Sequence, residues 1–156
     1  MFKVGIVGCG GIGMAHARSW SAVDGVKVAA AVDLDPAKAK ALADVCGAEP
    51  LTDIAQLPSD LDAVSVVTPP QAHYPVIKSL LERGFNVFSE KPLTTDVAQG
   101  EGLVKLAEEK KCLLGVGFKM RYEPIFAEAK KLLPEVGKLV SIVTTKEQMF
   151  NPRPGG

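Results

Sequence analysis

The chain has 156 residues, of which 47% are hydrophobic and 23% are charged, a balance typical of a globular protein with one ordinary core. Its 18 basic and 18 acidic residues cancel, and the basic residues form no cluster that would suit a nucleic acid. No apolar stretch reaches the roughly 18 residues of a membrane-spanning helix, and the N-terminus lacks the features of a signal peptide. These properties predict a cytoplasmic protein that binds neither nucleic acid nor membrane.

The cysteines are few and widely spaced. Cys9, Cys46 and Cys112 include no close pair, so they predict neither a disulfide framework nor a metal site. Free thiols of this kind suit a reducing compartment, which agrees with the cytoplasmic expectation.

Short, almost continuously apolar stretches alternate along the chain with longer segments of helical periodicity. Continuous apolar runs are typical of strands buried on both faces of a parallel sheet. The alternation predicts an α/β fold in which right-handed crossovers build an open, doubly wound sheet. The predicted strands are Phe2–Val7, Val26–Asp33, Ala63–Thr68, Phe85–Glu90 and Leu113–Phe118, and the predicted helices are Ile12–Val23, Ala37–Val45, Ala72–Arg83 and Asp96–Lys111.

The pattern changes after Phe118. Tyr122–Leu133 has the apolar periodicity of a helix, and Leu139–Thr145 has the β-branched composition of a strand. We therefore expect one domain over residues 1–118 and the beginning of a second domain over residues 119–156. A strand in an incomplete sheet would leave an open edge, through which copies of the chain could associate.

A glycine-rich turn joins the first predicted strand to the first predicted helix. In Gly8-x-Gly10-x-x-Gly13, the first glycine would permit the tight turn, the second would let the backbone approach a diphosphate, and the third would let helix and strand pack closely. The free amides at the helix start would hold the diphosphate. No Lys-Ser/Thr pair follows, which excludes a P-loop. Methyltransferases use similar turns, so the turn alone leaves the ligand open.

An acidic residue, Asp33, ends the second predicted strand about 20 residues after Gly13, where a carboxylate can bind the adenosine ribose of a dinucleotide. Its charge would repel a 2′-phosphate, and no arginine or lysine follows before Lys38, so NAD is favoured over NADP. Asp33 could instead simply cap the next helix, but Asp35 stands in a better position for that role.

Two further loops follow predicted strands at the edge of the sheet where ligands of open α/β sheets bind. "VVTPPQAHYP" carries Thr68 in a turn stiffened by prolines, and His73, which the pattern explains more simply as a polar residue at a helix start. "FSEKPLTT" carries Glu90 and Lys91. A lysine in a cofactor cleft can donate a proton or a hydrogen bond to a substrate oxygen. The alternative is a surface ion pair between these two residues.

In their order and spacing these segments resemble the glucose–fructose oxidoreductase, inositol dehydrogenase and MocA (Gfo/Idh/MocA) family of nicotinamide-dependent oxidoreductases. The resemblance rests on "GIVGCGGIGMAHA", Asp33, "VVTPPQAHYP", "SEKPLTT" and "GVGFKMRYEP". It implies hydride transfer between NAD(H) and a secondary hydroxyl of a sugar or cyclitol, with Lys91 as the catalytic lysine. It implies cofactor contacts from Gly8, Gly10, Gly11, Ile12, Gly13, Asp33, Thr68, Pro69, His73, Glu90, Lys91 and Arg121.

Members of that family have two domains and are about twice as long as this chain, and their second domain supplies an Asp-x-x-x-His pair. His16 and His73 are the only histidines here, and neither stands in such a pair. We therefore expect the cofactor-binding portion, which binds NAD with little or no turnover. Two alternatives stay open: a non-catalytic nucleotide-binding sensor or regulatory module, and an S-adenosylmethionine methyltransferase, in which the Glu-Lys-Pro loop would have no role.

Overall fold

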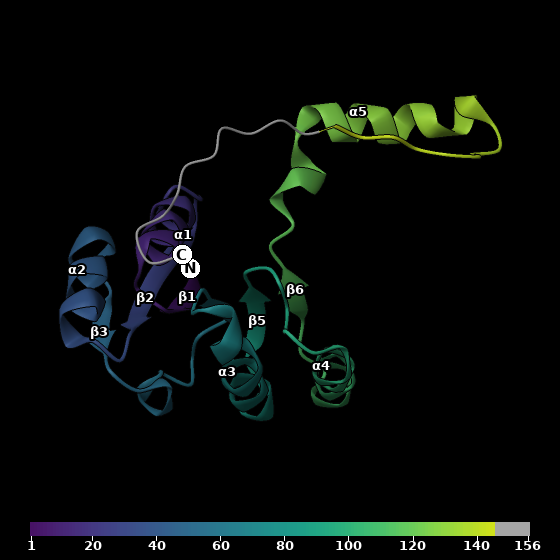
Figure 1. Ribbon diagram of the computed structural model, residues 1–156. Coiled ribbons are helices and arrows are strands. Elements are labelled where there is room, and N and C mark those ends of the chain that lie inside the picture. Colours follow the sequence, from purple (N-terminus) through teal and green to yellow (C-terminus); the bar gives the residue numbers. More distant parts are fainter. Residues whose placement is uncertain (146–156) are drawn as a thin grey trace. The chain divides into compact units, whose positions relative to one another are not determined.

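The computed structural model describes residues 1–145 (Figure 1). The chain divides into two compact units, Met1–Phe118 and Lys119–Gly156. The first unit is a parallel sheet of six strands flanked by helices, which confirms the predicted α/β class. Within the described part of the chain, no helix is both long enough and apolar enough to cross a membrane.

The sheet has the spatial order β3-β2-β1-β4-β5-β6, and every neighbouring pair is parallel. The chain therefore starts at the centre, fills one side of the sheet outward, and returns to fill the other side. The order reverses between β1 and β4, and such a reversal opens a crevice at the carboxyl ends of the strands. The strands are β1 Phe2–Val7, β2 Val26–Val32, β3 Glu49–Leu51, β4 Ala63–Val66, β5 Asn86–Ser89 and β6 Leu114–Val116.

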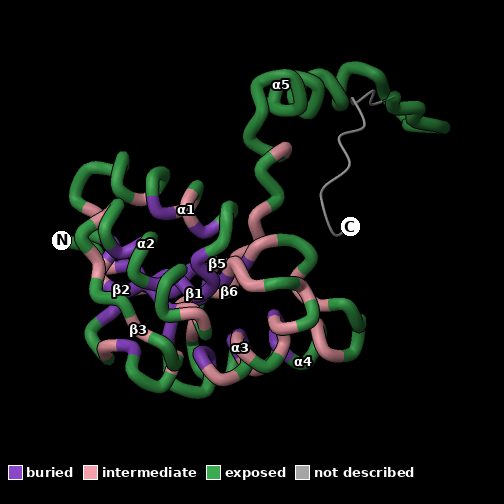
Figure 2. Tube along the Cα trace, turned by 60° about the vertical axis from the view of Figure 1, so that its left-hand side comes forward, coloured by how far each residue is buried: buried purple, intermediate pink, exposed green. Residues whose placement is uncertain are grey.

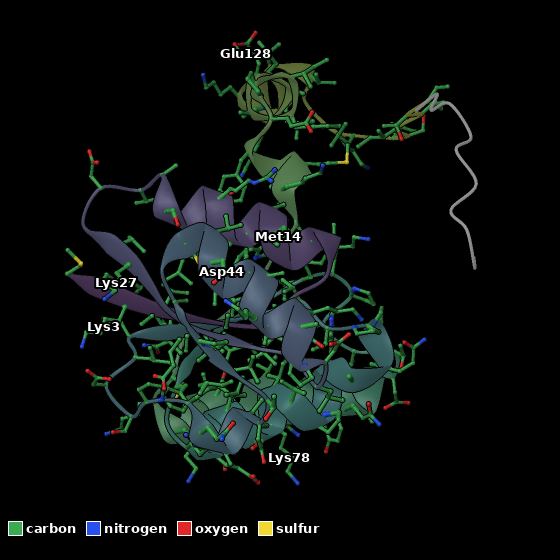
Figure 3. All side chains as sticks on the ribbon, turned by 90° about the vertical axis from the view of Figure 1, so that its left-hand side faces the viewer. Lys3, Met14, Lys27, Asp44, Lys78 and Glu128 are labelled. Atoms are coloured by element: carbon green, nitrogen blue, oxygen red, sulfur yellow. The ribbon has the colours of Figure 1, made fainter. Side chains whose placement is uncertain are left out.

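Helices cover both faces of the sheet, with α1 and α2 on one face and α3 and α4 on the other (Figure 3, in which Asp44 marks α2 and Lys78 marks α3). Each face has its own apolar core, and the buried residues are concentrated in the strands and on the inner sides of the helices (Figure 2). The bounds are α1 Gly11–Ser21, α2 Pro36–Cys46, α3 Pro70–Glu82 and α4 Val97–Lys110.

All nine elements predicted for this unit are present, with ends displaced by one or two residues at most. The sequence pattern missed β3, which has three residues and includes Glu49 and Pro50. Proline cannot donate to a strand ladder, so it is tolerated at a sheet edge, and β3 is such an edge strand. The short 3-10 helix Ile54–Gln56 that follows is held by a capping box from Asp53.

The second unit is helical where the structure describes it. The 3-10 helix η2 (Lys119–Tyr122) leads into α5 (Pro124–Leu132), which confirms the predicted helix, and η3 (Leu133–Val136) follows. The predicted strand Leu139–Thr145 is wrong. Its large apolar side chains are exposed, from 45% for Leu139 to 92% for Val140, and residues 119–145 contain no second strand with which it could pair.

Strand composition alone does not make a strand, because the backbone groups need a partner. The association of copies that we expected through this strand therefore has no strand to support it. Residues 146–156 of the expected second domain lie outside the described residues.

Candidate functional site

The turn between β1 and α1 is built from glycines that leave no room for side chains. Gly8 has a φ of +101°, and a Cβ there would lie 2.8 Å from the backbone nitrogen of Thr68. A Cβ on Gly13 would lie 2.1 Å from the carbonyl oxygen of Gly8. Only glycine therefore allows α1 to start this close to the turn, and the turn to lie this close to the loop after β4.

The start of α1 is open. Gly10 is its N-cap, no side chain within residues 1–145 caps it, and no acidic residue lies in its first turn. Gly10 and Gly11 are exposed, and a Cβ on either would meet nothing within 4 Å; the next residue, Ile12, is 49% exposed. The first amides of a helix have no intrahelical acceptor and lie at the positive end of its dipole. This arrangement can bind an anion.

Asp33 follows β2 directly and is tied to the glycine turn. Its Oδ2 accepts a hydrogen bond from the backbone nitrogen of Cys9 at 2.8 Å, and its Oδ1 accepts one from the backbone nitrogen of Asp35 at 2.9 Å. A carboxylate offers about four acceptor positions, so each oxygen can accept a further donor. Asp35, as predicted, caps α2 by accepting from the amide of Ala37, so Asp33 is not the cap.

Cys9 is the residue between Gly8 and Gly10 in the turn, and its buried side chain brings no charge there. Its Sγ is 3.4 Å from the carbonyl oxygen of Val32, and the residue is 4% exposed. Burial raises the pKa of Cys9 to about 12, and the nearby carboxylate of Asp33 acts in the same direction. The thiol therefore stays neutral, and the amides remain the electropositive groups at this place.

The loop after β4 contributes a hydroxyl without a partner. Thr68 Oγ1 is buried and makes no hydrogen bond within residues 1–145. A buried polar atom left unsatisfied costs about 1–3 kcal/mol, so a ligand that supplied a partner would be favoured here. Pro69 is exposed and is the N-cap of α3, which has no side-chain cap.

His73 joins this loop to the loop after β5. Its ring is 1% exposed, with Nε2 2.9 Å from the carbonyl oxygen of Thr68 and Nδ1 2.7 Å from that of Pro92. Both ring nitrogens therefore face backbone oxygens, and a contribution of His73 to ligand binding would act through the two loops that it holds together. Its contact with a cofactor stays a prediction.

Glu90 and Lys91 follow β5 at the same edge of the sheet. Glu90 Oε2 accepts a hydrogen bond from the backbone nitrogen of Lys91 at 3.2 Å, and the Lys91-Pro92 peptide bond is cis. Glu90 Oε1 pairs with His16 Nε2 at 3.2 Å. The ammonium of Lys91 is exposed and pairs with no residue of the described chain, so the alternative of an ion pair between Glu90 and Lys91 is wrong.

Two residues at this edge escaped the sequence pattern, His16 of α1 and Ser65 of β4. The two side chains contact each other, because His16 Nδ1 lies 2.8 Å from Ser65 Oγ. The available signal was a serine inside a buried strand, Ala63–Val66, where the neighbouring residues are apolar. A buried serine needs a hydrogen-bond partner, but the sequence does not say which residue supplies it.

Arg121 lies in η2 of the second unit, and its expected position near the cofactor or the domain junction stays a prediction. The other predicted site residues of the first unit lie in the loops and helix starts that follow β1, β2, β4 and β5. Among the described residues, no three His, Cys, Asp or Glu side chains gather in a way that could hold a metal ion.

The strand order, the glycine turn that opens α1 and the acidic residue after β2 together define a Rossmann domain that binds NAD(P). The chain belongs to the Gfo/Idh/MocA family, because the family model described as "Oxidoreductase family, NAD-binding Rossmann fold" matches residues 2–118. The resemblance inferred from the sequence is thereby confirmed.

Relatives and solved structures agree with this assignment. The inositol 2-dehydrogenase of Rhizobium meliloti is 30% identical over 153 residues, which cover 96% of this chain and 46% of that relative. The inositol 2-dehydrogenase of Corynebacterium glutamicum is 35% identical over 147 residues, with 90% and 44% covered. The crystal structure of KijD10, a 3-ketoreductase from Actinomadura kijaniata in complex with NADP, superposes with a TM-score of 0.80 at 31% identity and covers 86% of this chain and 44% of that one.

The chain thus spans less than half the length of these relatives. Their names describe two inositol dehydrogenases and a 3-ketoreductase, and the structure of KijD10 holds NADP. The family membership establishes an oxidoreductase lineage with a nucleotide-binding domain.

Proposed function

We propose that this chain carries the cofactor domain, residues 1–118, of an NAD-dependent dehydrogenase that oxidises a secondary hydroxyl of a sugar or cyclitol, with residues 119–156 beginning a second domain. The observation that carries the proposal is the open start of α1 beside the anchored carboxylate of Asp33. These two features support the proposal, because the amides would bind a diphosphate and the carboxylate beside them would accept hydrogen bonds from ribose hydroxyls.

The preference for NAD over NADP rests on Asp33 and its surroundings. The carboxylate is fixed by two backbone amides, so it cannot turn away from a ligand without losing both hydrogen bonds. Leu34, the next residue, is 92% exposed and offers no charge to a 2′-phosphate. Lys38, the first basic residue after β2, lies 3.7 Å from Asp35 in an ion pair. A 2′-phosphate would therefore meet carboxylates and no free cation in this loop.

The residues after β4 and β5 would act at the other end of the cofactor. The nicotinamide ring, when bound, supplies the hydride acceptor. The buried hydroxyl of Thr68 has an unused donor and would bind a polar group of the cofactor. The exposed ammonium of Lys91 is free to bind the substrate oxygen, where its positive charge would stabilise the alkoxide that develops as the proton leaves.

A binding experiment tests the cofactor site. Titration calorimetry with NAD and NADP should show tighter binding of NAD. Gly10→Ala should lose at least about tenfold in NAD affinity, because a methyl group there would keep the backbone from the diphosphate. Its circular dichroism should match the wild type, since that methyl group meets no atom of residues 1–145 within 4 Å.

Gly102→Ala is the matched control, because a methyl group there also meets nothing within 4 Å among the described residues, and Gly102 lies in α4, outside the glycine turn. This variant should bind NAD like the wild type. Equal binding of NAD by wild type and Gly10→Ala would contradict the diphosphate site, and tighter binding of NADP than NAD would contradict the role of Asp33. Binding of S-adenosylmethionine in place of either dinucleotide would favour a methyltransferase.

The role of Lys91 is tested by separating binding from hydride transfer. Lys91→Ala should weaken NAD binding by no more than about threefold, and should lower the small rate of NADH formation that this portion shows with polyols such as myo-inositol to the rate without protein. Lys91→Arg keeps the charge but not the compact ammonium, and should recover little of the rate. An unchanged rate in Lys91→Ala would remove this residue from the chemistry.

A further inference from the structure

Both histidines of the chain form hydrogen bonds with the loop that carries Lys91. His73 bonds to the backbone of that loop, whereas His16 bonds to the side chain of Glu90. We propose that His16 is a positioning residue, which holds the carboxylate of Glu90 beside Lys91 and is itself fixed in one tautomer by the buried hydroxyl of Ser65. The link from this arrangement to cofactor affinity rests on the proposed function; the arrangement itself does not.

The three residues come from three separate elements. Ser65 lies in β4 and is fully buried, His16 lies in α1, and Glu90 follows β5. His16 Nδ1 is 2.8 Å from Ser65 Oγ, and His16 Nε2 is 3.2 Å from Glu90 Oε1. The histidine therefore connects the helix that opens at the glycine turn with the loop that carries Lys91.

The donors and acceptors around His16 select one tautomer. The carboxylate of Glu90 can only accept, so His16 Nε2 must carry a proton to bond with it. The hydroxyl of Ser65 makes no other hydrogen bond within residues 1–145 and can donate to Nδ1. A neutral ring with its proton on Nε2 thus satisfies all three groups, whereas the other tautomer would turn the lone pair of Nε2 toward the carboxylate.

Aromatic side chains pack around the ring of His16. The ring of His16 lies 5.9 Å from that of Phe88 in a tilted contact, and Trp20, one turn further along α1, meets the same phenylalanine edge-on at 6.3 Å. On the other side, a Cβ on Gly117 would lie 3.3 Å from Glu90 Oε1. Phe88 therefore packs against the ring of His16, and Gly117 lies close to the carboxylate oxygen that this ring binds.

The arrangement suits orientation and does not suit proton transfer. Its far end, Ser65, is fully buried in the central part of the sheet, so a proton passed along the three groups would have no outlet to solvent. At its near end, the second oxygen of Glu90 accepts from the backbone nitrogen of Lys91. The bonds therefore fix the start of the Glu-Lys-Pro loop relative to α1 and β4.

The tautomer is tested directly by nitrogen NMR on histidine-labelled protein at mildly alkaline pH, without any cofactor. The signals of His16 are assigned by their loss in His16→Gln, which is feasible because the chain has only two histidines. We expect the proton on Nε2, and in Ser65→Ala we expect a mixture of tautomers, since Nδ1 loses its donor. A proton on Nδ1 in the wild type would overturn the proposal.

The positioning role is tested with two substitutions, each of which keeps one of the two hydrogen bonds of the His16 ring. The amide nitrogen of glutamine can take the place of Nε2 and still donate to Glu90, whereas the shorter asparagine can reach Ser65 but not Glu90. We expect NAD affinity in His16→Gln to stay within about twofold of the wild type, and in His16→Asn to fall about fivefold. Thermal unfolding of both variants controls for loss of structure.

Addition of Glu90→Gln to His16→Asn should then cost little more affinity, because the carboxylate is already released. Equal NAD affinities of His16→Gln and His16→Asn would overturn the positioning role. So would a double variant in which Glu90→Gln lowers the affinity as much as it does in the wild-type background. If the wild type binds no dinucleotide, the proposed function fails, while the tautomer measurement still decides whether His16 holds Glu90.

Discussion

Helices α1 and α2 have equal lengths of 11 residues and lie on the same face of the sheet, but they begin in opposite ways. α2 begins with a side-chain cap from Asp35 followed by Pro36, a combination that stabilises a helix start by about 1 kcal/mol. α1 begins at Gly10 with bare amides. The start of α1 therefore lacks the stabilisation that a cap gives to α2, and its amides stay available to a ligand.

The other two helices of the first unit repeat the contrast. α4 is capped by Asp96, which accepts from the amide of Gln99, whereas α3 begins at Pro69 without a side-chain cap. The uncapped helices α1 and α3 follow β1 and β4, the two strands between which the order of the sheet reverses. The capped helices follow strands further out. Bare helix starts therefore coincide with the crevice in which open α/β sheets bind their ligands.

Gly13→Ala tests the close approach on which the open start of α1 depends, and should have the largest effect. The new methyl group would lie 2.1 Å from the carbonyl oxygen of Gly8, so α1 would have to move away from the turn. We expect the free energy of unfolding to fall by about 3 kcal/mol and NAD binding to be lost. Urea denaturation and calorimetry measure the two effects, and an unchanged unfolding midpoint would contradict the packing argument.

Asp33→Ala removes the acceptor that ties the two helix starts together. The amides of Cys9 and Asp35 would both lose their partner, which should cost about 2 kcal/mol of stability. The preference for NAD over NADP should fall at the same time. Asp33→Asn keeps one oxygen and should lose less stability. Equal stability of wild type and Asp33→Ala would show that water replaces the carboxylate at no cost.

Asp35→Ala exchanges the capped start of α2 for an uncapped one. We expect a loss of about 1 kcal/mol in the free energy of unfolding, because the amide of Ala37 loses its acceptor. The NAD affinity should not change, since the proposed site uses the start of α1. A weakened affinity would mean that the two helix starts are not independent.

Gly11→Ala raises the helix propensity of α1 without adding a cap to its first amides, and should have the smallest effect on stability. The methyl group meets nothing within 4 Å, so alanine should raise stability by about 0.5 kcal/mol through the lower entropy of the unfolded chain. The amides are untouched. A large loss of stability here would show that α1 lacks a cap because its start is strained, and not because it binds an anion.

The fold was predictable from sequence where the local signal and the tertiary environment agree. Buried parallel strands such as Phe2–Val7 are apolar throughout, and the helix start signals are local. Leu139–Thr145 has an equally strong strand composition but finds no partner within the described residues, and composition carries no information about partners. Glu49–Leu51 shows the converse, because the neighbouring β2 makes a strand of residues with poor strand propensity.

The site was predictable to the same extent. Gly8 and Gly13 act within one turn, so their spacing is visible in the sequence. His16 was missed because its partners, Ser65 and Glu90, are 49 and 74 residues away and are brought to it only by the sheet. Such hydrogen bonds depend on which strands are neighbours, and a single sequence does not specify that.

The double attachment of Asp33 bears on attempts to redesign this domain for a phosphorylated cofactor. Such a redesign replaces the acid after the second strand by a small or basic residue, so that a phosphate is tolerated. In this chain the same side chain also accepts hydrogen bonds from the glycine turn and from the start of the helix that follows β2. A successful swap must therefore restore an acceptor for the amides of Cys9 and Asp35, and asparagine or serine accompanied by a basic residue at Leu34 is a better starting point than arginine alone.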